Sequence, residues 1–460
     1  MYILEYILIE KEIFKSNNIF DFISIIFYYL SQEKITPLFG RYRKSVESKK
    51  YKKEFMQIEE LFSVLFFYNE IDKEYFCDFL NEWISLYKSI KIDCDIFCLE
   101  TLYSFDKNYA NSNYSLVLKT NLQAQGPLNN ALKDKVLFYN VSPDSCLSDY
   151  LEKNNVRKGR QTVLYDPTSL DCQFKNFHIV NTDLLNSLKP TVIKYNKLIN
   201  IEDTSLIGIV ASKIDDNFSV KYDGGSKLFN IEYTNEKFES HMNYIFDIIT
   251  KMDANGFKII IFPELFLFPE SLDILRRFLC SNKLNNIQLI FTGSEWKNNK
   301  NSAFILSSSG TVLSKHSKKT PYEHYCKEND ITYLENIEKE NDIEFLDIPG
   351  IGRISYLICR DFLTGYLPNL CTGIMESNVM CISAYTSKTD LMIKSSEYIA
   401  TLKGAVSIFC NSCSAIRENK NLLGYIIVPK VENKQLTFSK KIFSKDDKDC
   451  DNCQKCYLSN

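Results

Sequence analysis

With 460 residues, the chain is long enough to bury a large core and to form two or three domains. A hydrophobic fraction of 45% and a charged fraction of 25% exclude global disorder, because both are near globular averages. The formal net charge of -3 gives no bulk attraction to nucleic acid or membranes. No segment approaches the roughly 20 uncharged apolar residues of a membrane span, and we expect no signal peptide.

The fifteen cysteines favour a reducing compartment. Their number is odd, they are scattered, and Cys359 and Cys381 stand in apolar runs. Buried free thiols explain this pattern better than a secreted disulfide framework does. We therefore predict a cytoplasmic protein.

Residues 1–105 are predicted to form a helical N-terminal region, because apolar residues recur there at three- and four-residue steps. Within it, Arg41–Phe55 is a basic run with two tyrosines. This run is either a solvated helix face or linker, or a contact for phosphate or a partner. Residues 106–202 are predicted to be a mixed α/β segment with short strands, and they carry no motif that indicates a role.

Residues 203–430 are predicted to form an α/β domain. The segment opens with a buried strand at Ser205–Ser212 and continues with an apolar helical stripe that ends at Asn255-Gly256. Strand-like and helix-like runs then alternate, which predicts parallel strands joined by helices. A hairpin turning at Ser309-Gly310 follows. The later predicted elements are the strands GRISYLIC, VMCISA, AVSIFCN and LLGYIIVPK and the helix SSEYIATLKG.

The polar tail, residues 431–460, contains Cys450, Cys453 and Cys456 in two overlapping CxxC steps. Three cysteines are one short of a Cys₄ zinc site, and no histidine lies nearby. A metal site would need a ligand from elsewhere, so a cysteine-bearing tail without metal is the simpler interpretation.

Three polar residues follow apolar strands, where α/β folds place their active sites. Glu264 in IIIFPEL fits a general base, although it also fits a helix cap. Lys318, which competes with Lys315 and Lys319, fits a fixed cation that stabilises an oxyanion. Cys359 in SYLICRDF fits a nucleophile at the start of a turn and a helix, where its pKa would be lowered.

This ordered set resembles the carbon–nitrogen hydrolases, the nitrilase superfamily, over about 225 residues. FPEL resembles the base motif of that family. The strand from Gly310 to Lys318 resembles its lysine element and selects Lys318 over Lys319. ICRDF resembles its nucleophile motif. Weaker similarities lie in SLIGIVAS, NSAFILSSSG and AVSIFCNS.

The resemblance implies a four-layer α-β-β-α sandwich whose helical face pairs with a second copy, here preceded by the mainly helical N-terminal domain. It implies hydrolysis of a small amide or nitrile through an acyl-enzyme on Cys359, without a metal or an organic cofactor. The backbone N–H of Arg360 would join Lys318 at the oxyanion. The side chains expected within reach of the pocket are those of Tyr322, Tyr385 and Asn411.

The sequence also departs from the family pattern. The family often has a second glutamate shortly after the lysine, but Cys326 stands there and Glu323 and Glu328 flank it. We expect Glu323 to be the second carboxylate. Arg360 replaces the aromatic residue that usually follows the cysteine, and residues 1–202 lie outside the resemblance.

Other mechanisms and functions remain open. His316 and His324 flank the lysine segment, so a Cys–His pair is a rival mechanism. A catalytically dispensable scaffold, whose N-terminal region recruits a protein or nucleic-acid partner, is the alternative function. An intact set of Glu264, Lys318 and Cys359 argues for the enzyme, because a scaffold needs none of the three.

Overall fold

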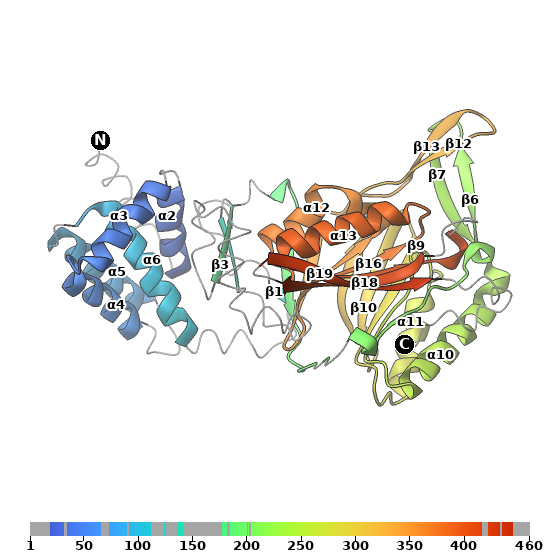
Figure 1. Ribbon diagram of the computed structural model, residues 1–460, viewed down its shortest axis with the longest axis horizontal. Helices are drawn as coiled ribbons and strands as arrows, with labels where there is room; N and C mark the ends of the chain where they lie inside the picture. Colours follow the sequence, from blue (N-terminus) through green and yellow to red (C-terminus); the bar gives the residue numbers. More distant parts are fainter. Residues whose placement is uncertain are drawn as a thin grey trace. The chain divides into compact units, whose positions relative to one another are not determined.

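Figure 1 shows the computed structural model of the chain. The structure describes residues 19–31, 35–65, 73–89, 92–111, 124–125, 136–140, 177–181, 185–199, 201, 204–415, 422–432 and 435–444. The chain divides into two compact units. The first comprises 1–141 and 157–188, and the second comprises 142–156 and 189–460. The division at residues 188 and 189 falls within the segment to which the sequence assigned no role.

The first unit is mainly helical, as the sequence predicted. Its helices are α2 (Ile19–Ser31), α3 (Ile35–Glu47), α4 (Lys52–Leu65), α5 (Lys73–Ser89) and α6 (Cys94–Asn111). Aromatic side chains fill the core between them, with Phe22 packed edge-on against Phe79 and Trp83. The unit also contains the short strands β1 (Ala124–Gln125), β2 (Val136–Asn140) and β3 (Phe177–Asn181), of which β2 and β3 pair antiparallel.

The basic run Arg41–Phe55 covers the end of α3 and the start of α4. Arg43, Lys44 and Lys50 are exposed, whereas Arg41 donates to the buried Asp95 at 2.8 Å. The run is therefore a solvent-facing helix surface with one anchoring ion pair.

A five-stranded sheet forms one half of the second unit, in the order β11-β10-β9-β8-β5. Its strands are β5 (Ile207–Ile209), β8 (Ile259–Ile261), β9 (Leu289–Lys297), β10 (Lys300–Ser307) and β11 (Val312–Ser317). Strands β5, β8 and β9 are parallel and both faces of β8 are buried, as expected for strands joined by helices. The β10–β11 hairpin confirms the predicted turn, where Gly310 adopts a φ of 78°.

A larger sheet contains, in spatial order, the neighbouring strands β4, β14, β15, β16, β17, β18 and β19. Their bounds are Lys189–Lys194, Asp342–Ile348, Gly352–Ile358, Val379–Ala384, Val406–Asn411, Leu422–Glu432 and Gln435–Ser444. The central strands β15, β16 and β17 are parallel and fully buried, which explains their unbroken apolar sequences. Regular structure continues past residue 430, because β19 pairs with β18 along most of its length.

The two sheets and their helices form the predicted four-layer α-β-β-α sandwich (Figure 1). Helices α10 (Phe238–Ala254) and α11 (Ser271–Ser281) pack on the five-stranded sheet through an apolar cluster. Helix α13 (Thr389–Lys403), which follows the short α12 (Tyr366–Asn369), packs on the larger sheet, where Ser396 and Tyr425 form a 2.8 Å hydrogen bond. Between the sheets, the Ser383 hydroxyl donates to the carbonyl of Phe262 at 2.6 Å.

A four-stranded sheet forms what we call the arm, residues 218–233 and 323–335. Its strands β6 (Phe218–Asp223), β7 (Leu228–Tyr233), β12 (Glu323–Cys326) and β13 (Ile331–Glu335) lie in the order β12-β13-β7-β6. Figure 1 shows these strands projecting from one end of the sandwich. The parallel pairing of β13 with β7 joins two hairpins that are far apart in the sequence. None of these four strands was predicted from the sequence, and the β6–β7 hairpin is closed by a turn at Asp223–Ser226.

The tail cysteines Cys450, Cys453 and Cys456 lie outside the described residues. Within the described ranges, no group of His, Cys, Asp and Glu side chains has the arrangement of a metal site. None of the helices in those ranges is both long and apolar enough to cross a membrane.

Candidate active site

Glu264 is held in a tight loop directly after β8. Gly293 on β9 makes this loop possible, because a Cβ atom there would lie 2.1 Å from the carbonyl oxygen of Pro263. The Leu265 N–H donates to the Ser294 hydroxyl at 2.9 Å, and the Gly293 N–H donates to Tyr356 at 3.1 Å. The carboxylate of Glu264 is buried, with 3% of the residue exposed.

Lys318 lies just beyond β11 and is the centre of a buried ionic network. Its Nζ atom lies 2.8 Å from Oε1 of Glu264 and 2.8 Å from Oε2 of Glu335. The amide of Asn301 donates to the same oxygen of Glu264 at 2.9 Å. The Tyr385 N–H donates to the other oxygen of Glu264 at 3.0 Å.

The two other candidate lysines do not bind Glu264 in the structure and have other partners. Lys319 donates through Nζ to the carbonyl of Asp342 at 2.7 Å. Lys315 pairs with Glu340 at 3.2 Å near the surface.

Cys359 follows β15 and occupies a strained position. Its φ of 46° lies in the left-handed region that non-glycine residues rarely adopt. It begins a 3₁₀ helix (Cys359–Leu363), and the α-helix α12 starts only at Tyr366. A turn this short offers little helix dipole to lower the pKa of the thiol.

The pKa values of the buried groups follow from burial and mutual charge. Burial raises the pKa of Cys359 well above its usual range and the charge of Glu264 raises it further, although Lys318 opposes this shift. The sequence expectation of a lowered thiol pKa was therefore wrong. Burial lowers the pKa of Lys318, but Glu264 and Glu335 outweigh it and raise that pKa well above the ordinary value. Burial also raises the pKa of Glu335, against the opposing charge of Lys318.

Glu335 occupies the place for which the sequence analysis chose Glu323. Glu323 is exposed on the arm and pairs with Arg360 at 3.1 Å. Glu335 ends β13, and its Oε2 atom accepts the Tyr322 N–H at 2.7 Å. The β12–β13 hairpin lengthens the chain between Lys318 and the second carboxylate to 17 residues, so spacing along the sequence pointed to the wrong glutamate.

Two of the three side chains expected within reach of the pocket line it: Tyr322 and Tyr385 do, whereas Asn411 lies outside the lining. Arg360, of which only the backbone N–H was expected at the oxyanion, pairs through its side chain with Glu323. Asn411 is buried and bonds the backbone of Thr386 in both directions, at 3.0 and 2.9 Å. It therefore supports the loop that carries Tyr385.

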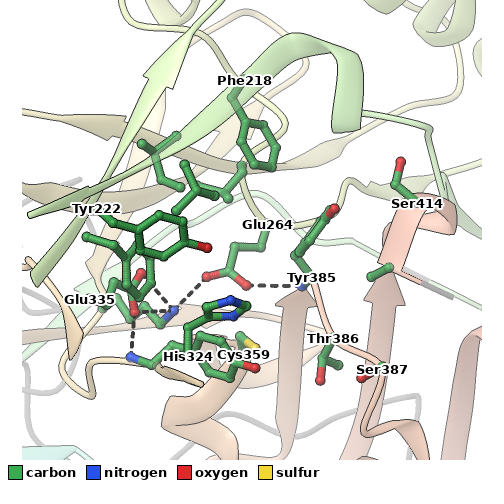
Figure 2. Close-up of a pocket in the computed structure, with 17 residues that line it drawn as sticks. Phe218, Tyr222, Glu264, His324, Glu335, Cys359, Tyr385, Thr386, Ser387 and Ser414 are labelled. Carbon is green, nitrogen blue, oxygen red and sulfur yellow. Dashed lines mark hydrogen bonds and ion pairs between the residues drawn. The ribbon is translucent and has the colours of Figure 1, made fainter. Parts of the chain in front are cut away.

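The two histidines of the rival mechanism are separated. His316 is buried and its Nε2 atom lies 2.9 Å from Asp361, which also accepts the backbone N–H groups of Lys319 and Thr320. His324 lines the pocket from the arm and stacks on Tyr222, with ring centroids 5.6 Å apart. Only His324 thus faces the pocket, as part of an aromatic wall (Figure 2).

A pocket of about 380 Å³ brings these groups together. Figure 2 shows Glu264 and Glu335 joined by the lysine ammonium near Cys359, with Phe218 and Tyr222 of the arm on another side. Thr386, Ser387 and Ser414 line the pocket from loops of the sandwich. The volume lies in the usual range for small-molecule sites, roughly 300–1,000 Å³.

Several residues that line the pocket, or bind the side chains that do, were not predicted from the sequence. Glu335 was hidden by the hairpin, and Asn301 carries no local signal because an asparagine in a strand has many uses. The aromatic residues Phe218 and Tyr222 stood in a segment for which no strand was predicted. Their alternation along β6 was the one available signal, since every second residue of a strand faces the same side.

The four-layer sandwich with cysteine, lysine and glutamate in one pocket is the fold that the nitrilase resemblance implied. No family model matches the sequence and no curated protein matches it. Solved structures with similarity include Nit3 of Saccharomyces cerevisiae, described as a member of the nitrilase superfamily. It is 12% identical with a TM-score of 0.34, over 51% of this chain and 88% of that chain.

Two further structures show comparable values. An amidase from Nesterenkonia sp., also described as a nitrilase-superfamily protein, is 11% identical with a TM-score of 0.35, over 52% of this chain and 90% of that one. The glutamine-dependent NAD+ synthetase of Acinetobacter baumannii is 13% identical with a TM-score of 0.36, over 52% of this chain and 44% of that one.

Proposed function

We propose that the chain is a thiol-dependent hydrolase that cleaves a non-peptide carbon–nitrogen bond in a small amide or nitrile. The observation that carries this proposal is the convergence of Glu264, Lys318 and Cys359 in one buried pocket, from three separate strands. A carboxylate, a cation and a thiol in that arrangement are the parts of covalent acyl transfer.

The first half of the reaction forms the acyl-enzyme. Glu264 takes the proton of the Cys359 thiol as the sulfur attacks the carbonyl carbon of an amide. Lys318 and the backbone N–H of Arg360 stabilise the negative charge on the oxygen. The carbon–nitrogen bond then breaks, and Glu264 returns the proton to the leaving nitrogen.

The second half releases an acid. Glu264 takes a proton from a water molecule, whose oxygen attacks the thioester carbon. The carbon–sulfur bond breaks, and the proton returns to the sulfur of Cys359. For a nitrile, the sulfur attacks the nitrile carbon and Glu264 passes the thiol proton to the nitrogen, which gives a thioimidate. A water molecule then adds to the thioimidate and ammonia leaves, and the resulting thioester is hydrolysed by a second water molecule in the same way.

The electrostatics support a general-base role for Glu264. Because burial raises the pKa of Cys359, the resting thiol keeps its proton near neutral pH. A thiol in this state needs a base during attack. We assign Glu335 to positioning, because it binds both the ammonium of Lys318 and the backbone of Tyr322.

Labelling with iodoacetamide tests the proposal, since this reagent is itself a small primary amide. Cys359 should react faster than the exposed Cys280 in the same molecule, despite its burial. The Glu264→Gln variant keeps the shape of the side chain and should lose this advantage, with Cys280 unchanged. If Cys359 reacts no faster than Cys280 in the wild type, the proposal fails.

The substrate assay completes the test. Wild type should release ammonia from small amides or nitriles, and Cys359→Ala should not. If Cys359→Ala is folded and keeps the biological activity of the chain, the scaffold alternative is favoured instead.

We also propose a homodimer formed through the helical face of the larger sheet, in a cytoplasmic setting. Leu391, Tyr398 and Leu402 on α13 are 50%, 52% and 40% exposed, and Ile442 on the adjacent β19 is 48% exposed. Grouped apolar exposure of this kind is typical of an interface. Analytical ultracentrifugation should show a dimer for the wild type and a monomer for Leu402→Asp, whereas a monomeric wild type contradicts the proposal.

A further inference from the structure

The arm and the adjoining Tyr322 present exposed apolar side chains to the pocket. Val220, Tyr222 and Tyr322 are 38%, 41% and 37% exposed, and all three line the pocket. Large apolar side chains that remain open to water in a concave site gain free energy when an apolar group covers them. This wall therefore favours a ligand with an apolar portion.

The wall is aromatic and its rings hold one another in place. Tyr222 stacks on His324 and contacts Tyr333, with centroids 4.7 Å apart. Phe218 of the arm contacts Tyr385 of the sandwich edge-on, with ring centroids 5.6 Å apart. Figure 2 shows Phe218 and Tyr222 with their rings on the pocket side of the arm. Rings fixed in this way are ready to stack on a flat group without losing further freedom.

The charged side chains of the pocket indicate that the ligand carries no carboxylate. The Asp, Glu, Lys and Arg side chains among the described lining residues are Glu264, Lys318 and Glu335. Two carboxylates already lie within 2.8 Å of the single ammonium. A carboxylate on the substrate would therefore meet negative charge without a cation of its own. Arg360 does not line the pocket, and it pairs with Glu323.

We infer that the substrate is an uncharged amide or nitrile whose acyl side carries an aromatic ring, which stacks against Tyr222 and Phe218. This inference rests on the proposed function for the position of the carbon–nitrogen bond at Cys359. The ring then lies between the arm and the loop of Tyr385. Acyl groups that end in a carboxylate are selected against.

Binding to the Cys359→Ala variant tests the inference without turnover. Hydrocinnamamide, succinamic acid, propionamide and cyclohexanepropionamide share one chain and differ in the terminal group. By calorimetry at pH 8, hydrocinnamamide should bind about tenfold or more tightly than propionamide and succinamic acid. It should also bind more tightly than the cyclohexane analogue. In the wild type, the same order should appear as protection of Cys359 from iodoacetamide, which covers the case of a poorly folded variant.

Variants of the arm locate the binding. Tyr222→Leu should reduce the preference for hydrocinnamamide by about tenfold. Tyr325→Leu is the matched control, because Tyr325 stands on β12 of the same arm, is 54% exposed and lies outside the pocket lining. Equal losses in both variants would overturn the assignment to Tyr222.

The outcomes separate the two proposals. Selective binding of hydrocinnamamide without hydrolysis by the wild type supports the aromatic site and refutes the hydrolase. Hydrolysis of all amides with succinamic acid bound as tightly as hydrocinnamamide overturns this inference and leaves the hydrolase standing. Equal binding of the cyclohexane analogue overturns the aromatic part.

Discussion

Lys318 and Glu335 are 17 residues apart in the chain, yet the Nζ atom of Lys318 lies 2.8 Å from Oε2 of Glu335. The β12–β13 hairpin between them leaves the pocket and returns to it, with Glu335 as the last residue of β13. The same strand pairs with β7, and Glu335 stands opposite Phe229. One glutamate thus connects the arm to the proposed catalytic lysine, so substitutions in the arm are expected to change the rate of the proposed reaction.

Replacing Glu335 by Gln should lower kcat/KM by roughly 10- to 100-fold, because Lys318 loses one of its two fixed partners. The negative charge of Glu335 also raises the pKa of Cys359. Its removal should therefore shift the pH profile of iodoacetamide labelling at Cys359 to lower pH. The exposed Glu323→Gln variant is the control and should change neither quantity. A profile that stays in place would show that Glu335 does not act electrostatically on the thiol.

Lys318→Met should destabilise the protein by about 3–5 kcal/mol at pH 7, because Glu264 and Glu335 remain buried without a cation. Without the opposing charge of Lys318, burial raises the pKa of Glu335 further, so the unfolding free energy of this variant should fall as pH rises through that pKa. Urea denaturation at pH 5 and pH 7 measures both effects. Lys315→Met, which breaks only a surface pair, should cost about 0–1 kcal/mol. A similar cost for both variants would contradict the network.

Gly293→Ala should cost about 2 kcal/mol or more, because a Cβ atom would clash with the backbone oxygen of Pro263 at a φ of 73°. Gly256→Ala is the matched control. Its φ is 83° but no atom lies within 4 Å of the added Cβ, so only backbone strain of about 1 kcal/mol applies. Urea denaturation compares the two. Gly293→Ala should in addition slow labelling of Cys359, since the loop that holds Glu264 must shift.

Glu100 should make the helical unit sensitive to pH. Burial raises its pKa to about 7, from an ordinary value of 4.5, although the Tyr42 hydroxyl donates to it. The contribution of Glu100 to the free energy of unfolding is therefore complete below about pH 4.5 and is lost as pH rises toward 7. The loss is on the order of 2–3 kcal/mol. Glu100→Gln should flatten this dependence, as measured by hydrogen exchange of α6 between pH 4.5 and 8. The exposed Glu47→Gln variant should keep the wild-type slope, and a slope that survives in Glu100→Gln would rule out this origin.

The sequence predicted most strands and helices of the sandwich because these elements carry local patterns, whereas their arrangement in four layers was implied by the family resemblance. The continuous apolar runs of β15, β16 and β17 reflect burial on both faces. The apolar stripe of α10, from Met242 to Met252, reflects its contact with the five-stranded sheet. Each signal lies within one element, so no knowledge of distant residues was needed to read it.

The arm and the second carboxylate could not be predicted in that way. The pairing of β13 with β7 joins residues that are about 100 positions apart, and hydrogen bonds between backbones leave little trace in side chains. The ion pair between Arg360 and Glu323 also joins residues that are far apart, 37 positions along the chain. Likewise, the expected lowering of the Cys359 pKa ignored burial and Glu264, which only the packed structure supplies.

By itself, the sequence determined the order of Glu264, Lys318 and Cys359 and the strand after which each one stands. Tertiary structure alone decided which groups surround them: Glu335 in place of Glu323, the amide of Asn301, and the aromatic wall of the arm. The physical reason is that strand ends are fixed by local apolar patterns, whereas charge balance and pocket shape depend on segments that meet only when the chain folds. Three residues of the site can thus be predicted from the sequence, and the others are added by contacts between distant segments.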